Sequence, residues 1–256
     1  MPVAHRTFTT PDGLTHAYYE LAVGNGGPPV ILQHGFSATT IDEWVEPGIA
    51  AAIGTLGRRV IGLDALGHGR SDHPHEPRHY GEPRMAADIS ALASHLDLGN
   101  FDLVGYSMGA IVALLVAVGE PRLRRLVVGG VGEGVIVCGG VDRRVLDTAL
   151  LAEGLRADDI STYPRLVQDF RRGIERRGND RLALAAHSEA RHASPIPLER
   201  IAAPTLLLAG DIDPLAAHPE RLAAAIPDCR LVKVPGDHTG ARLAPDFTAA
   251  LVDFLR

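Results

Sequence analysis

Short apolar runs recur along most of the chain and predict strands. The first segment predicts a β-hairpin, with strands at His5–Thr10 and Leu14–Val23 around a Pro11-Asp12-Gly13 turn. The later runs lack polar alternation, as in the strands of a parallel sheet that helices cover on both faces. These runs are Val30–Gln33, Val60–Leu63, Phe101–Val104, Leu126–Val128, Thr205–Ala209 and Leu231–Val234.

Between several of these runs, apolar residues recur at helical spacing. Alternation of strands with helices predicts an α/β fold with a doubly wound, mostly parallel sheet. The apolar residues of the expected helices form three groups: Met85, Ile89, Leu92 and Leu96; more loosely Leu215, Leu222 and Ile226; and Phe247, Leu251 and Phe254.

One stretch interrupts this alternation. Residues 132–194 contain no convincing strand, only a helical pattern rich in arginine and aspartate that breaks at Pro164, Gly173 and Gly178. The strand pattern resumes after Pro204. We therefore expect a sheet core formed by residues 1–131 and 195–256, with residues 132–194 as a small helical cap over one edge.

Composition narrows the function classes. The 256 residues carry a net charge of -6, which argues against a nucleic-acid partner. Cys138 and Cys229 are too few for a disulfide framework and lack metal-ligand spacing. No signal-peptide pattern is visible, and the longest apolar run, Ala110–Val118, is far shorter than the ~20 residues of a membrane span. We expect a cytoplasmic protein with a small-molecule substrate and no membrane partner; monomer and homodimer both remain open.

The most informative motif is G-x-S-x-G, formed by Gly105, Ser107 and Gly109. It follows the apolar run that begins at Phe101 and precedes an apolar helix. Glycines flank the serine because the strand-to-helix turn is too sharp for side chains. In this context the motif predicts that Ser107 is a nucleophile at the carboxyl end of the sheet.

A serine hydroxyl needs a base to take its proton and an acid to hold that base. The run Thr205–Ala209 leads into a loop with Asp211 and Asp213, and the next run leads to His238. The chain order Ser107, Asp213, His238 is that of hydrolases with a nucleophile elbow. For the oxyanion we expect two backbone donors, the N–H groups of Met108 and Phe36.

Five segments together resemble the α/β-hydrolase superfamily, in particular its serine esterases and lactonases with a helical cap. The resemblance implies an eight-stranded, mostly parallel sheet with the cap after the sixth strand. It favours Asp213 as the acid, although Asp211 remains an alternative, as does Glu133 at the end of the sixth strand. Leu66 departs from the family pattern, where arginine or proline is common. The matching segments are His34–Phe36, Asp64–Asp72, Gly105–Gly109, Gly210–Asp213 and Gly236–His238.

The resemblance and the motifs imply a cofactor-independent serine hydrolase of carboxylic esters, lactones or thioesters. The expected catalytic residues are Ser107, Asp213 and His238, with no cofactor and no metal. The alternatives are a carbon–carbon bond hydrolase of the same fold, an acyltransferase or perhydrolase, and a ligand receptor that retains the triad. An aspartate at position 107 would have indicated dehalogenase or epoxide-hydrolase chemistry.

Other conspicuous polar residues have simpler interpretations. We expect His34 and His68 to shape their glycine-rich loops, and Cys138 to be a packing residue. We interpret the histidine cluster at 73–79 as a solvated loop, not a metal site. The arginine pairs 171–172 and 176–177 are expected on a solvated helix face, although a cap arginine, Arg191 included, could instead hold a substrate carboxylate.

Overall fold

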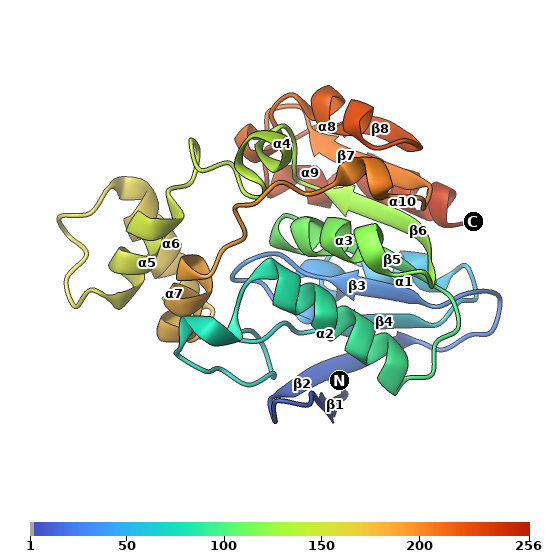
Figure 1. The fold of residues 1–256 in the computed structure, drawn as a ribbon, viewed down its shortest axis with the longest axis horizontal. Helices are drawn as coiled ribbons and strands as arrows, with labels where there is room; N and C mark the ends of the chain where they lie inside the picture. Colours follow the sequence, from blue (N-terminus) through green and yellow to red (C-terminus); the bar gives the residue numbers. More distant parts are fainter. Residues whose placement is uncertain (1–2) are drawn as a thin grey trace.

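The computed structural model describes residues 3–256, which form an eight-stranded sheet in the order β1-β2-β4-β3-β5-β6-β7-β8 (Figure 1). Strand β2 is antiparallel to both of its neighbours, and the pairs from β4 through β3 to β8 are parallel. The prediction of a mostly parallel sheet of eight strands is confirmed. The strands are β1 His5–Thr9, β2 Thr15–Ala22, β3 Val30–Gln33, β4 Val60–Leu63, β5 Phe101–Tyr106, β6 Leu123–Gly129, β7 Thr205–Gly210 and β8 Cys229–Val234.

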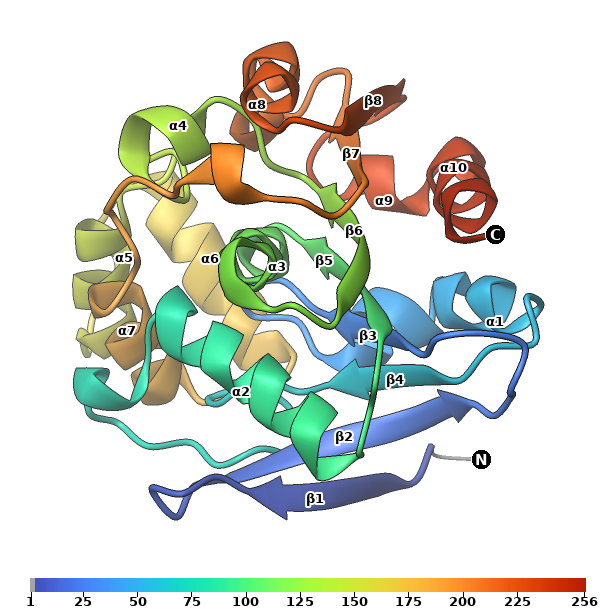
Figure 2. The same ribbon diagram turned by 45° about the vertical axis from the view of Figure 1, so that its right-hand side comes forward.

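Helices cover both faces of the sheet (Figure 2). One face packs against α2, α3 and α8, and the other packs against α1, α9 and α10. Side chains of successive strand residues point to opposite faces, so both sets must be apolar, and this explains the unbroken apolar runs. The helices are α1 Ile49–Gly54, α2 Glu82–His95, α3 Met108–Gly119, α8 Pro219–Ala225, α9 Gly240–Leu243 and α10 Pro245–Leu255.

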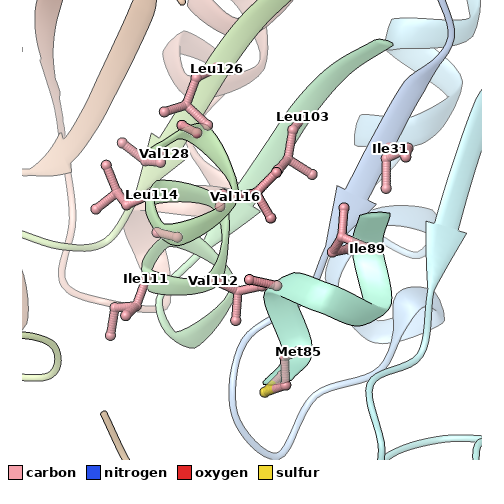
Figure 3. Close-up of a cluster of buried hydrophobic side chains, with 14 of the residues drawn as sticks. Ile31, Met85, Ile89, Leu103, Ile111, Val112, Leu114, Val116, Leu126 and Val128 are labelled. Atoms are coloured by element: carbon pink, nitrogen blue, oxygen red, sulfur yellow. The ribbon is translucent and has the colours of Figure 1, made fainter. Parts of the chain in front are cut away.

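The larger core cluster lies between the sheet and helices α2 and α3. Figure 3 shows part of this cluster, in which Leu103 of β5, Val128 of β6 and Ile31 of β3 lie on the sheet side. Val112 of α3 and Ile89 of α2 lie on the helix side. All five side chains have at most 1% of their surface exposed. Full burial of each such side chain contributes roughly 1.5–3 kcal/mol. The result is a rigid support for the strand ends where the site lies.

The segment proposed as the cap, residues 132–194, holds four helices and, throughout its length, no strand. Figure 1 shows α5, α6 and α7 standing beyond the carboxyl ends of the strands. They enclose a small apolar cluster of their own that includes Leu155, Ile174 and Leu184. The side chains of Asp147 and Asp180 cap α5 and α7. The bounds are α4 Gly134–Cys138, α5 Thr148–Arg156, α6 Arg165–Arg176 and α7 Arg181–Glu189.

Two local details differ from the sequence-based expectation. Leu215 does not share a helix with Leu222, because it lies in a separate 3₁₀ turn, Pro214–Ala216, before α8 begins at Pro219. A π-helical turn at Ile41–Val45 was not expected. Within residues 3–256 no helix has both the length and the apolar character needed to cross a membrane.

Candidate active site

The turn from β5 into α3 holds Ser107 in a conformation that side chains rarely adopt. Ser107 has φ 54° and ψ -118°, and its N–H donates a hydrogen bond to the Gly129 carbonyl (2.8 Å). A Cβ atom on Gly105 would lie 2.1 Å from the Gly109 carbonyl oxygen, and one on Gly109 would lie 2.2 Å from the Gln33 oxygen. The two glycines of the motif are therefore required by close backbone packing. This strained turn projects the serine hydroxyl from the edge of the sheet.

His238 links Ser107 to Asp213. Its Nε2 lies 2.9 Å from Ser107 Oγ, and its Nδ1 lies 2.8 Å from Asp213 Oδ2. Asp213 is 4% exposed, and its second oxygen accepts a hydrogen bond from the Leu215 N–H (2.9 Å). The Asp213 carboxylate can only accept a hydrogen bond, so a neutral His238 ring must carry its proton on Nδ1, which faces that carboxylate. Its Nε2 is then free to accept a hydrogen bond from the Ser107 hydroxyl.

The two alternative acids are engaged elsewhere. Asp211 accepts a hydrogen bond from the Gly236 N–H (2.8 Å), which joins the loops after β7 and β8. Glu133 accepts hydrogen bonds from Arg144 Nη2 (2.7 Å) and Arg221 Nη1 (2.5 Å). The bond from Arg144 is the main cause that holds the pKa of Glu133 below its ordinary value. Of the three carboxylates, the structure brings only Asp213 to His238.

Tyr106, the residue before Ser107, fixes the histidine loop. Its hydroxyl donates a hydrogen bond to the His238 carbonyl (2.7 Å), and its ring centre lies 5.4 Å from that of the imidazole. Burial, and after it the charge of Asp213, raises the pKa of Tyr106. The hydroxyl therefore keeps its proton and remains a donor.

The two expected oxyanion donors belong to residues that line hollows next to Ser107. Met108 is the first residue of α3, so its N–H has no acceptor within the helix. Phe36 lines the same cleft as Ser107 and His238. Within residues 3–256 neither N–H is used in another hydrogen bond. Both are thus available to a substrate oxygen.

Hydrogen bonds of two histidines and of Glu43 position the loop that carries Phe36. His34 Nε2 accepts from the Ala65 N–H (3.0 Å), and His68 Nε2 accepts from the Ser37 N–H (3.2 Å). Burial, followed by the proximity of His34, keeps the pKa of His68 well below its ordinary value. The ring is therefore neutral and can accept. Both histidines shape glycine-rich loops, as the sequence indicated.

A cleft of about 340 Å³ opens in front of Ser107 and His238. At its base, Glu43 forms a buried ion pair with Arg242 and accepts a hydrogen bond from the Gly35 N–H (3.2 Å). Sequence reasoning missed both Glu43 and Arg242. Neither belongs to a motif, and they meet only because the loop after β3 packs against α9. The remaining polar side chains of the cleft wall are Ser37, Asp42, Thr239 and Arg177.

The expectation of a solvated arginine face on α6 is wrong for one of the four residues, Arg171. Arg171 is 7% exposed and donates to the carbonyls of Gly154 (2.9 Å) and Ala157 (2.6 Å). Its spacing from Val167 and Ile174, four residues before and three after, was the available signal that it faces inward. Arg172, Arg176 and Arg177 are exposed, as expected, and Arg177 also lines the cleft.

Arg177, at the end of α6, is bonded to the loop that carries Phe36. Its Nη2 donates to Ser37 Oγ (2.9 Å) and its Nε to the Ser37 carbonyl (3.2 Å), which also accepts from Asn179 (2.8 Å). Ser37 has φ 60°, a conformation that needs support in a residue other than glycine. It also follows Phe36 directly. The cap therefore contacts the site next to an expected oxyanion donor.

The remaining residues singled out from the sequence lie outside the cleft wall. Arg191 stacks on the ring of Phe36, with its guanidinium carbon 4.6 Å from the ring centre. His75, in the histidine cluster, lies 2.9 Å from Asp180 and joins its loop to the start of α7. Cys138 is buried at the end of α4, and Leu66 is buried beside Tyr80 and cap residues.

Comparison with known proteins identifies the fold family of the chain. The family model described as alpha/beta hydrolase fold matches residues 28–130. A Synechocystis protein provisionally named non-heme chloroperoxidase is 30% identical over 248 residues, 86% of each chain. A Bacillus subtilis protein provisionally named 2-succinyl-6-hydroxy-2,4-cyclohexadiene-1-carboxylate synthase is 26% identical over 254 residues, 89% of each chain. The crystal structure of a hydrolase from Pseudomonas aeruginosa is 27% identical, with 98% of each chain covered and a TM-score of 0.79.

The fold, the elbow and these similarities define the class. The chain belongs to the α/β-hydrolase superfamily, an enzyme family, and it has hydrolase relatives over nearly its whole length. The relatives bear the names of different reactions, so membership alone does not give the reaction.

Proposed function

We propose that this protein is a serine hydrolase that cleaves a carboxylic ester, lactone or thioester of a small to medium-sized substrate. One observation carries the proposal: Asp213, His238 and Ser107 form a continuous hydrogen-bonded series, with separations of 2.8 and 2.9 Å, that ends at an open cleft. A base in contact with a nucleophile, itself held by an acid, is the arrangement that activates a serine hydroxyl.

The reaction follows from the positions of these groups. His238 Nε2 removes the proton from Ser107 Oγ as the oxygen attacks the substrate carbonyl. The N–H groups of Phe36 and Met108 bind the oxyanion, and such a donor contributes a factor of about 10²–10³ to the rate. The imidazolium, stabilised by Asp213, then gives its proton to the leaving alcohol or thiol. Water, activated by His238, releases the acyl group from Ser107.

A second candidate uses the same acyl-enzyme with another acceptor. The similarity to a protein named as a chloroperoxidase favours transfer of the acyl group to hydrogen peroxide, which yields a peracid. Analysis of the products formed with competing peroxide or alcohol distinguishes this route from hydrolysis. Cleavage of a carbon–carbon bond by the same triad would be indicated by turnover of a meta-cleavage product without ester hydrolysis, and a receptor would bind a ligand tightly with negligible turnover.

The test is removal of the nucleophile. A fluorophosphonate probe should label the wild-type protein on Ser107, and Ser107→Ala should lose both labelling and hydrolysis of p-nitrophenyl acetate. We expect kcat to fall by roughly 10⁴-fold or more. Ser90→Ala is the matched control, because Ser90 lies on α2 outside the cleft wall, and it should change neither signal. Full hydrolysis by the Ser107→Ala protein would refute the proposal.

A further inference from the structure

Ser107 separates two spaces of very different size. On one side lies the cleft of about 340 Å³, whose wall includes His238 and several polar side chains. On the other side lies a recess of about 10 Å³, which has room for one group the size of a water molecule or a methyl group. The side chains of this recess are mainly apolar and come from Met108, Ile111, Val131, Val141 and Leu215. Its polar side chains are Ser107 and Asp142, whose carboxylate accepts a hydrogen bond from Arg144 (2.6 Å).

The direction of proton transfer decides which part of a substrate enters each space. The leaving oxygen must lie within reach of His238 Nε2, because that atom supplies its proton. His238 lines the large cleft and is not part of the wall of the recess. With the carbonyl oxygen directed at the N–H groups of Phe36 and Met108, the leaving group occupies the cleft. The acyl substituent then points into the recess.

We propose that the recess is an acyl-binding site that restricts this enzyme to very short acyl groups, acetyl above all, carried on a polar alcohol or thiol. This inference rests on the proposed serine hydrolase function and specifies its substrate class. The side chains of the cleft favour a polar leaving alcohol or thiol. Asp42, Arg177 and the Glu43–Arg242 pair line this cleft and can form hydrogen bonds with such a group.

The walls of the recess resist enlargement. Met108, Ile111 and Val131 belong to the main core cluster and have at most 4% of their surface exposed. Val141 packs against both the main core and the apolar cluster of the cap. Leu215 is fixed through its N–H, which donates to Asp213 Oδ1. Well-packed walls of this kind do not move aside for additional methylene groups without strain.

The experiment is a series of p-nitrophenyl esters with acyl chains of two, four, six and eight carbons. The leaving group is constant, so kcat/KM reports the fit of the acyl chain alone. Since a single methylene is worth about 10–200-fold in a confined pocket, we expect the wild type to lose at least roughly 10²-fold between acetate and hexanoate. Leu215→Ala keeps the backbone N–H that holds Asp213 and lengthens the recess. It should raise the hexanoate-to-acetate ratio by about 10-fold or more.

Two further variants make the result decisive. Val141→Ala enlarges the recess from the cap side and should also raise the hexanoate-to-acetate ratio. If thermal unfolding shows that the Leu215→Ala protein is not folded, Val141→Ala provides the test in its place. Phe170→Ala is the matched control, because Phe170 lines the cleft and not the recess, and its ratio should equal that of the wild type.

The possible failures are distinguishable. Equal rates for acetate and hexanoate in the wild type, or a ratio that responds to Phe170→Ala and not to the recess variants, would overturn the acyl-site assignment and leave the serine hydrolase intact. No turnover of any ester, together with no fluorophosphonate labelling of Ser107, would overturn the proposed function and this inference with it.

Discussion

The two walls of the cleft are built in different ways. On the core wall, Ser107 and His238 follow β5 and β8, and hydrogen bonds of 2.9 Å or shorter connect them to each other and to buried Asp213. On the cap wall, Phe170 and Arg177 lie in α6 and at its end, and Arg177 is exposed on its outer side. The core wall is supported by the sheet, whereas the cap wall is supported by a small separate cluster.

This difference suits the two walls to different tasks, the core wall to proton transfer and the cap wall to the selection of substrates. Groups that transfer protons must be positioned to within fractions of an ångström, and strand ends backed by a packed core provide this. Groups that contact the leaving part of a substrate need only be complementary to it, and a helical insertion can vary without disturbing the strands. Substitutions on the core wall should therefore affect kcat severely, and those on the cap wall should have milder effects.

The largest effect should come from the acid on the core wall. Asp213→Asn should lower kcat for p-nitrophenyl acetate by on the order of 10⁴-fold, because an amide directed at Nδ1 favours the wrong imidazole tautomer. Asp211→Asn should lower kcat by less than about 10-fold, since its carboxylate only accepts from the Gly236 N–H. Steady-state kinetics on both variants test this, with thermal unfolding as a check on folding. A larger loss in Asp211→Asn would reassign the acid.

The same contrast explains what could be predicted from the sequence. Ser107, Asp213 and His238 were predictable because each directly follows an apolar strand or its turn, so local pattern fixes where it lies. The sequence favoured Asp213 but left Asp211 and Glu133 as alternatives. The structure adds that these two carboxylates have other partners, the Gly236 N–H and two arginines. The direction of Arg177 and the pairing of Glu43 with Arg242 depend on how separate elements pack. Residue spacing carries no signal for such contacts.

A smaller effect should come from the contact between the walls. Arg177→Ala removes two of the hydrogen bonds that support Ser37, the residue after Phe36, while His68 and Asn179 keep theirs. We expect kcat for p-nitrophenyl acetate to fall by about 3–10-fold with little change in KM, because the oxyanion forms only in the transition state. Arg177→Lys, which can keep one of the bonds, should lose less.

Arg176→Ala is the matched control for this contact. Arg176 is exposed, lies one residue earlier and is not part of the cleft wall, so its removal should leave kcat and KM unchanged. If Arg177→Ala and Arg176→Ala have the same kcat, the cap does not support the loop that carries Phe36. The two walls would then be independent.

The smallest expected effect concerns a buried carboxylate of the core that lies away from the site. Asp88 of α2 is 5% exposed, and burial raises its pKa to about 7. Its nearest titratable neighbour is His16, 3.6 Å away, and burial lowers the pKa of that ring to about 4. Of the nearby charges, Arg84 lowers the pKa of Asp88 and Asp12 raises it. Asp213 accepts hydrogen bonds from His238 and Leu215, whereas within residues 3–256 the Asp88 carboxylate has no hydrogen-bond partner.

The raised pKa of Asp88 predicts that its carboxylate destabilises the folded state at high pH. An unfolded aspartate titrates near ~3.9, so between about pH 4 and 7 the unfolded chain releases a proton that folded Asp88 retains. The folded state therefore loses stability as the pH rises through this window, and the full cost applies above pH 7. Asp88→Asn should raise the melting temperature at pH 8 by on the order of 5 °C, and by little at pH 4.

Scanning calorimetry at pH 4 and pH 8 tests this prediction. Asp253→Asn, which removes an exposed carboxylate, is the control, and its melting temperature should differ from that of the wild type by the same amount at both pH values. An Asp88→Asn protein that is less stable than the wild type at pH 8 would show that the folded core is stabilised by the charged form of this carboxylate.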